Sequence, residues 1–470
     1  MDNIPITGLD DLTAHMDALI ADPSTPLNAK LFDDIELQLT DFNTPPLLTT
    51  LLPRLVQILH TTPSDPTTPA SLTTKLLRPL SFSQIVSLAP PESLIQALES
   101  PFPAANILAM TILHKAAASP SEVAQLADMQ KVVKALVRTW LGSSEVGVGE
   151  KGGRVMGDLL DVDCEQEPPA RPQRGRGRGA TGHALDAGMP TWHDMVLRKE
   201  KGEGKLWKRV FADEEVYGLL LDLLAGRHED TDVTSTTAGH DGHDGHDEDA
   251  EERRKQKARQ LTLAQGRILR ILPRLAALDL EKIARSDSLA APPPTPSYYA
   301  IAAPTNGTTN NGHSTPQPNG TSSNRPNQNG DDILIMNGIS DSEEPTPLSF
   351  PLPAPPKPGQ GLLHFAALRM VDRNDMLMHL SLIDFLEAFV GLMRVTPHSE
   401  YKVAVVKEIL REALLADGDD NNNDKLLRES LESLPDRAVD EEREGLRGWL
   451  AEVMPVVVGD MEERREVVMR

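Results

Sequence analysis

Apolar side chains recur at helical spacing through most of this 470-residue chain. The spacing is visible at Leu9, Leu12 and Met16, and again over 48–59 and 375–396. Residues three or four positions apart share one face of an α-helix, so each of these segments predicts an amphipathic helix. No segment alternates apolar and polar residues in the way of a half-buried strand. Aromatic residues make up only 4% of the chain, which also disfavours a sheet protein. We therefore predict an all-α fold.

The predicted helices repeat at a regular interval. Leu98 and Leu141 each begin a short turn, and they lie 43 residues apart. The helices that follow these turns end near Ile112 and Leu159, which lie 47 residues apart. HEAT and armadillo units have periods of about 40–47 residues, and each unit must stack on its neighbours to bury its apolar face. The chain is therefore predicted to form a HEAT/armadillo-like α-solenoid.

A proline in a capping context marks one helix start within this series. Ser119, Pro120 and Glu122 have the spacing of a capping box with proline at the first helical position. The apolar positions that follow continue at helical spacing from Val123 to Trp140. We expect a single helix here, ending near Gly142.

Low-complexity stretches interrupt the helical pattern. The segment 287–360 holds 15 of the 38 prolines, together with Asn/Gly/Thr runs, and cannot bury enough apolar surface to offset its ordering entropy. Two shorter stretches are rich in Arg/Gly and in Asp/His/Gly, and a fourth, 417–424, is rich in Asp and Asn. The predicted division is N-terminal HEAT-like repeats over 1–164, a disordered Arg/Gly linker over 165–189, solenoid continuation over 190–226, an acidic His/Asp/Gly disordered insertion over 227–252, a solenoid helix over 253–286, the Pro/Asn/Gly-rich disordered insertion over 287–360, and C-terminal HEAT-like repeats over 361–470.

Charge and the absence of targeting signals limit the expected partners. The chain has 47 Lys+Arg against 70 Asp+Glu, a net charge of −23, and this overall field repels a polyanion such as duplex DNA. The first residues lack the basic start and apolar stretch of a signal peptide. The most apolar helical stretch, 376–395, is interrupted by His379, Asp384 and Glu387, so no membrane span is expected. A lone cysteine, Cys164, excludes a disulfide framework. We expect a monomer in the cytoplasm, or in the cytoplasm and nucleus, without nucleic-acid or membrane partners.

Motifs for catalysis and for cofactor binding are absent from the sequence. It has no nucleophile elbow, no phosphate-binding loop and no His-Glu-x-x-His helix. The chain is therefore predicted not to be an enzyme, with no catalytic, cofactor-binding or metal-binding residues and no cofactor.

Two low-complexity tracts leave weaker alternatives open. His240, His243 and His246 have spacing that can converge on a transition metal, but an Asp/Gly repeat lacks the surrounding shell that orients ligands. The Arg-Gly repeat around 171–178 can bind single-stranded RNA or accept methyl groups, yet no aromatic residue is interleaved for base stacking. Solvated linkers are the favoured interpretation of both tracts.

A cationic window over 198–209 stands out in this acidic chain. It abuts Trp207 and Phe211, and patches that combine cations with aromatic residues are enriched at protein interfaces. We predict Lys208 and Arg209 as partner-binding residues and Trp207 and Phe211 as core residues. The alternative is a core helix with a solvated basic face.

Several segments resemble one protein family. They are 141–151 (LGSSEVGVGEK), 156–160 (MGDLL), 205–213 (KLWKRVFAD) with 216–217 (VY), 272–276 (LPRLA), 362–367 (LLHFAA) and 376–379 (MLMH). Together they resemble the proteasome non-ATPase regulatory subunit five family, whose fungal members carry a DNA mismatch repair name. The resemblance is distributed over roughly 9–414. The long low-complexity insertions depart from the compact members of this family.

The resemblance implies a function without catalysis. Members of this family are HEAT-repeat chaperones that bind the C-terminal domain of one AAA-ATPase subunit of the proteasome base and leave the finished complex. The expected partner is therefore an AAA-ATPase subunit of the proteasome base, bound during assembly of the regulatory particle. A generic solenoid adaptor or scaffold and a DNA-repair accessory factor are the alternatives.

Overall fold

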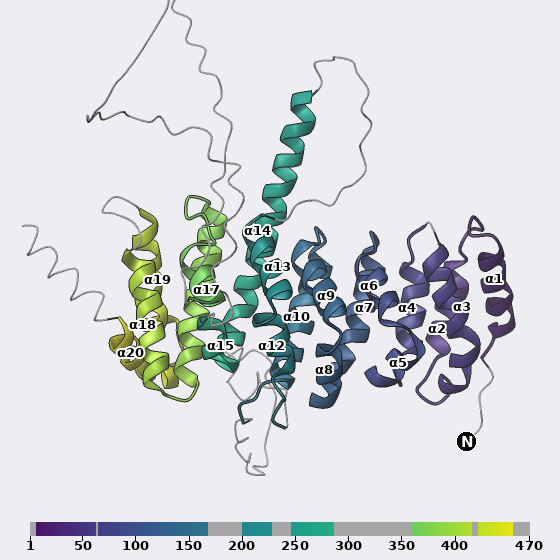
Figure 1. The fold of residues 1–470 in the computed structure, drawn as a ribbon, viewed down its shortest axis with the longest axis horizontal. Helices are drawn as coiled ribbons and strands as arrows, with labels where there is room; N and C mark the ends of the chain where they lie inside the picture. Colours follow the sequence, from purple (N-terminus) through teal and green to yellow (C-terminus); the bar gives the residue numbers. More distant parts are fainter. Residues whose placement is uncertain are drawn as a thin grey trace, which may run out of the picture. The chain divides into compact units, whose positions relative to one another are not determined.

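The computed structural model describes residues 6–62, 64–167, 200–227, 246–285, 360–415 and 422–454. Within these ranges every regular element is a helix, and none of the described residues forms a strand (Figure 1). The described residues belong to one compact unit, which spans Met1–Ala290 and Leu352–Arg470. The prediction of an all-α solenoid is confirmed.

The first helices build an N-terminal core of their own. They are α1 (Leu9–Ala21), α2 (Ala29–Gln38), the 3₁₀ helix η1 (Pro45–Leu47), α3 (Leu48–Thr61) and α4 (Thr67–Leu76). Helix α5 (Phe82–Leu88) follows, and its buried Phe82 and Ile85 belong to the larger core. Polar caps fix several starts: the Asn28 side chain accepts from the Leu31 amide, and Ser81 forms a capping box with Gln84. Leu72 and Leu76 of α4 lie in this N-terminal core, whereas Ala70 belongs to the larger core that follows.

The middle helices show the repeat that the sequence predicts. They are α6 (Pro91–Leu98), α7 (Pro103–His114), the 3₁₀ helix η2 (Lys115–Ala118), α8 (Pro120–Ala127), α9 (Gln130–Gly142) and α10 (Val146–Val162). Helix α6 packs against α7 and α9 against α10, and the equivalent helices of the two pairs also pack together, α6 on α9 and α7 on α10. The 43-residue offset therefore corresponds to one stacked helix pair.

The single helix expected after Ser119 is wrong, because two helices stand there. The Ser119 side chain accepts from the Glu122 amide as predicted, but α8 ends at Ala127. Met129 then takes φ −91° and ψ 67°, outside the helical region, and α9 begins at the next residue. The apolar spacing runs through the break without a Gly or Pro to signal it. The break lets α8 pack on α12 while α9 packs on α6 and α13, so tertiary contacts override local propensity.

The next helices carry the solenoid to the long insertion. They are α12 (Lys205–Phe211), α13 (Glu214–Leu224), α14 (His246–Leu278) and α15 (Leu280–Ala284). The start of α14 corrects the predicted boundary, since the expected disordered insertion 227–252 includes its first seven residues. No Gly or Pro occurs from 246 to 265, and Glu251 forms an ion pair of 2.7 Å with Lys255 one turn later. Charged residues thus extend a helix that apolar packing alone does not predict.

Helices on the far side of the insertion complete the same stack. They are α16 (Leu362–Leu368), α17 (Met376–Val395), α18 (Glu400–Leu415), α19 (Asn422–Arg437) and α20 (Asp440–Val453). Helix α17 packs against α14, and α16 packs against both α14 and α15. One series of helices therefore contacts step by step along the chain: α2, α4, α7, α10, α14, α17 and α19.

The ends of the long insertion lie side by side. The Gly361 amide donates to the Ala284 carbonyl at 2.9 Å, so the chain returns to within one hydrogen bond of the place where it leaves. Residues 286–359, which contain most of the predicted insertion, lie outside the described residues. Most of the Arg/Gly linker, the first part of the acidic insertion and 416–421 also lie outside them.

Helix α17 needs a separate remark about membranes. It is long and apolar enough to span a bilayer by length and composition, in contrast to the expectation from its interrupting polar residues. Half of the apolar window is buried within the protein, and a core helix passes the same test. His379, one of the interrupting residues, is fully buried. The helix is therefore weak evidence for a membrane span.

Candidate functional site

The predicted partner-binding residues lie on the short helix α12. Its N-terminus is held by a buried carboxylate: Asp163 accepts from the backbone amides of Leu206 and Trp207 at 2.6 and 3.1 Å. Burial raises the pKa of Asp163, and the amide hydrogen bonds only partly offset this effect. Trp207 is fully buried, and its indole nitrogen donates to the Leu160 carbonyl at 2.8 Å. The prediction that Trp207 and Phe211 are core residues is confirmed.

Arg209 is engaged within the protein. Its Nε donates to the Ala127 carbonyl at 2.9 Å, which ties α12 to the last residue of α8. Its guanidinium forms an ion pair of 2.5 Å with Asp213, and the side chain is 28% exposed. This contact network gives Arg209 a structural role, which its position in a cationic run does not predict.

Asp213 is the centre of this polar cluster. Its side chain caps α13 by accepting from the amides of Glu215 and Val216, and it also accepts from Gln130 of α9 at 3.0 Å. Burial raises the pKa of Asp213, but the hydrogen bonds from Val216, Arg209 and Gln130 outweigh that effect and lower the pKa below its usual value. The carboxylate is therefore ionised at neutral pH and holds three helices together.

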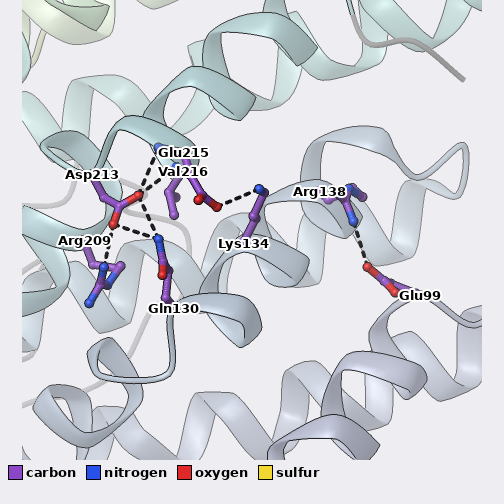
Figure 2. Close-up of polar contacts among 8 residues, drawn as sticks. All are labelled: Glu99, Gln130, Lys134, Arg138, Arg209, Asp213, Glu215 and Val216. Atoms are coloured by element: carbon purple, nitrogen blue, oxygen red, sulfur yellow. Dashed lines mark hydrogen bonds and ion pairs between the residues drawn. The ribbon is translucent and has the colours of Figure 1, made fainter. Parts of the chain in front are cut away.

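Helix α9 continues the polar contacts on both sides. Lys134 forms an ion pair of 3.0 Å with Glu215 of α13, and Arg138 forms one of 2.8 Å with Glu99 beside α6. Figure 2 shows Gln130, Lys134 and Arg138 reaching to different partners. We give the name polar seam to the contacts among seven side chains: Glu99, Gln130, Lys134, Arg138, Arg209, Asp213 and Glu215. Their charges pair within the protein, so the seam holds successive repeats together and leaves few free charges for a partner.

Of the two predicted partner-binding residues, Lys208 is the one whose charge remains available to a partner. Its side chain is exposed, and no carboxylate of the described residues lies within ion-pair distance. Glu165 lies near enough for Lys208 to help lower the pKa of its carboxyl, although the hydrogen bond from Lys282 is the main cause. The structure therefore separates the two predicted residues: Lys208 faces solvent and Arg209 is a packing residue.

Sequence reasoning missed a second buried network. Asp158, which is 12% exposed at its side chain, contacts His114 and Arg274 at 2.8 Å each. Arg274 also reaches Asp161, which is fully buried, at 3.3 Å. Burial raises the pKa of Asp158, but the hydrogen bonds from His114 and Arg274 together lower it below its usual value. This network joins α7, α10 and α14. In the sequence, the only sign of this network is the frequency of acidic residues over 158–165.

A hollow of about 350 Å³ opens between α2, α4 and α7. The residues that line it are all polar or charged, and they include Lys75, Arg78, His114 and Lys115. Among the described residues, no group of three or more His, Cys, Asp or Glu side chains is arranged so that it could hold a metal ion. Of the His tract, His240 and His243 lie outside the described residues, as does the Arg-Gly repeat.

The fold and the polar seam define a stacked helical-repeat protein whose cross-repeat charges are largely paired. Residues 10–141, which cover nearly all of α1 to α9, match the family described as DNA mismatch repair protein HSM3, N terminal domain. The match confirms the resemblance to the family that carries a repair name, over the part of the chain that it covers. Comparison with curated proteins and with solved structures found no match.

Proposed function

We propose that this protein is a non-enzymatic chaperone that binds the C-terminal domain of an AAA-ATPase subunit of the proteasome base while the regulatory particle assembles. The observation that carries the proposal is the family match over 10–141, on a chain whose described residues are all-α and stacked as repeats. The resemblance described above supplies the partner. A monomer in the cytoplasm or nucleus is part of the same proposal.

The architecture suits capture of a folded domain. Stacked helix pairs present an extended surface, and binding there needs side-chain contacts but no cofactor. Large interfaces depend on a few buried anchors within a polar rim. Helix α17 exposes Met376, Leu377 and Leu380 at 57%, 67% and 45% on neighbouring turns, and such side chains are suited to be anchors. Lys208 offers a charge for the rim.

Co-purification tests the proposal directly. The tagged full-length chain is expected to retain one base ATPase subunit from a lysate and to bind the isolated C-terminal domain of that subunit. Leu377→Asp with Leu380→Asp is expected to weaken this binding by about tenfold or more, because a lost anchor costs ~2 kcal/mol. Val56→Asp, on the exposed side of α3, is the control. Failure of every base ATPase domain to bind would reject the proposal.

Lys208→Glu tests the rim separately from the anchors. The substitution is made alone, because Arg209→Glu would place a carboxylate against Asp213 and disturb the fold. Binding of the ATPase domain is expected to weaken by a few-fold at low salt, while the melting temperature stays unchanged. The control is Lys30→Glu, which makes the same change of charge at an exposed lysine of α2. Equal binding by Lys208→Glu and wild type would remove Lys208 from the interface.

A repair function is the second candidate, because the matching family is described as a DNA mismatch repair protein. Filter binding of mismatched duplex at about 150 mM salt distinguishes the two candidates. We expect no specific binding, since a chain of net charge −23 repels a polyanion. Specific binding at micromolar or lower concentration would favour repair. Retention of a transport GTPase or a phosphatase subunit would instead favour a generic adaptor.

A further inference from the structure

Cations lie on or beside three helices that pack in succession, α4, α7 and α10. Lys75 in the last turn of α4 and Arg78 two residues beyond that helix line the hollow, together with Lys115, the residue that follows α7. Lys151 and Arg154 follow on α10, the next helix of the stack. We call these five side chains the basic strip.

Contacts with Asp158 place the α10 cations beside the hollow. His114, which lines the hollow, contacts Asp158 at 2.8 Å. Asp158 lies four residues after Arg154 and seven after Lys151, and this spacing puts all three on one face of α10. Burial lowers the pKa of Lys151, Arg154 lowers it further, and Asp158 raises it. These opposing effects agree with a position of Lys151 close to both Arg154 and Asp158.

The carboxylates around the strip leave its positive charge unbalanced. Glu36 lines the hollow and accepts from Ser71 at 3.0 Å, and Asp41 is 3.8 Å from Arg78 with both side chains largely exposed. Asp158 is already paired with Arg274. Among the described residues no carboxylate forms an ion pair with Lys75, Lys151 or Arg154. The strip is thus a local reversal of charge in a chain of −23.

Two of these ammonium groups are also held partly out of water. Burial lowers the pKa of Lys115 and of Lys151, and this effect exceeds the opposing influence of nearby carboxylates. Lys115 donates to the carbonyls of Arg78 and Leu80 at 3.0 and 2.8 Å. A partly desolvated cation without a carboxylate partner gains most from an incoming anion.

From this geometry we propose that the basic strip binds an extended acidic peptide segment of another protein. Packed helices lie about 8–10 Å apart, so the strip presents positive charge at that interval. A polyproline II segment repeats its faces every third residue, about 9 Å apart, so acidic side chains at every third position meet α4, α7 and α10 in turn. Such a ligand spans about seven residues. No Phe, Tyr or Trp side chain lines the hollow, and the His114 ring there already contacts Asp158, which disfavours stacking of nucleic-acid bases.

The test uses the full-length chain and a labelled synthetic peptide. A peptide of about nine glutamates is titrated by fluorescence anisotropy at about 50 mM salt, beside a glutamine peptide of the same length. Only the glutamate peptide is expected to bind, and its affinity is expected to fall at least about tenfold at 300 mM salt, because the contact is electrostatic. Equal binding of the glutamine peptide would overturn the proposal. Equal or tighter binding of a thymidine oligonucleotide would do the same.

Charge-reversal variants locate the binding site. Lys75→Glu with Lys151→Glu is expected to weaken glutamate-peptide binding by about tenfold or more. The double variant Lys30→Glu with Lys131→Glu changes net charge equally at exposed lysines outside the hollow, and it is expected to bind within about twofold of wild type. Lys75→Gln with Lys151→Gln provides a milder pair if the reversal lowers the melting temperature. Unchanged affinity in both strip variants would overturn the proposal. The peptide assay contains no ATPase, so its outcome is separate from that of the proposed function.

Discussion

Trp207 illustrates how one side chain can hold a short helix in place. Its ring is fully buried 5.2 Å from the Phe211 ring, with the ammonium of Lys282 5.8 Å away over its face. Trp207→Ala is expected to lower the free energy of unfolding by roughly 3–5 kcal/mol, because a large cavity opens and the Leu160 carbonyl loses its donor. Urea denaturation measures the change. Lys208→Ala, on the same helix but exposed, is the matched control and should cost less than about 0.5 kcal/mol.

Asp158 makes stability sensitive to acid. Its pKa is lowered in the folded protein, so the stability that it adds is present above the unfolded value, about 3.9, and is lost as the pH falls through the folded value. Asp158→Asn is expected to destabilise the protein at pH 7 by on the order of 1–3 kcal/mol. The difference from wild type should shrink as the pH falls below about 4. Urea denaturation of both proteins between neutral and acid pH measures this, and a pH-independent difference would contradict it.

Large apolar side chains in the core were predictable from the sequence, whereas buried polar side chains were not. Trp207 and Phe211 were predictable as core because their size and helical spacing have one favourable environment. Arg209 was not, because its partners include the carbonyl of Ala127, 82 positions earlier in the chain. Asp161 and Asp163 are fully buried, whereas composition alone places aspartate at the surface. Their roles depend on Arg274 and on the α12 amides, which only the fold brings near.

Helix α10 shows why a glycine-rich segment can be a helix. Glycine costs up to about 1 kcal/mol relative to alanine in a helix interior, so several glycines within 146–162 disfavour one. The fold uses their lack of a side chain: a Cβ at Gly152 would lie 2.7 Å from the Trp140 ring, and one at Gly149 would overlap the Arg267 guanidinium. That guanidinium donates to the Trp140 carbonyl at 2.9 Å. Close packing of α9 and α14 against α10 therefore requires small residues.

Substitution of single glycines in α10 tests this explanation. Gly152→Ala is expected to destabilise the protein by about 1–3 kcal/mol, because the buried Trp140 ring must move. Gly147→Ala is the control, since nothing lies within 4 Å of a Cβ built there, and it should leave stability unchanged or raise it by up to about 1 kcal/mol. Thermal and urea unfolding distinguish them. Equal effects of the two substitutions on stability would show that α10 can accommodate a Cβ at Gly152 without displacing Trp140.

At the scale of the whole molecule, the period of the repeat was predictable and its interruptions were only partly so. The 43-residue offset corresponds to α6 stacked on α9 and α7 on α10. The break at Met129 and the early start of α14 were missed. Both depend on contacts or charge pairs rather than on apolar spacing. The polar seam and the basic strip combine residues from separate repeats, so no single segment of sequence contains either.

The long insertion is expected to be dispensable for folding. Ala284 and Gly361 are already joined by a backbone hydrogen bond, so a Gly/Ser linker of about six residues can replace 286–359 without strain. Shortening the loop lowers its closure entropy by about 0.6 kcal/mol for each halving of length, and a gain of up to about 2 kcal/mol in the free energy of unfolding is expected. Thermal unfolding measures the result. A melting temperature more than about 5 °C lower would reveal packing by the removed residues.

The same hydrogen bond between Ala284 and Gly361 has a consequence for proteolysis and for engineering. Peptide bonds between 286 and 359 are not needed to hold α14 and α15 against α16 and α17, because the contacts are noncovalent: the Gln265 side chain donates to the Met370 carbonyl at 2.8 Å in a buried setting. The gene can accordingly be cut there into two open reading frames. Two co-expressed fragments, one ending near 290 and the other beginning near 352, should assemble in the way that the fragments of a nicked enzyme do. They should then elute as one species in size-exclusion chromatography.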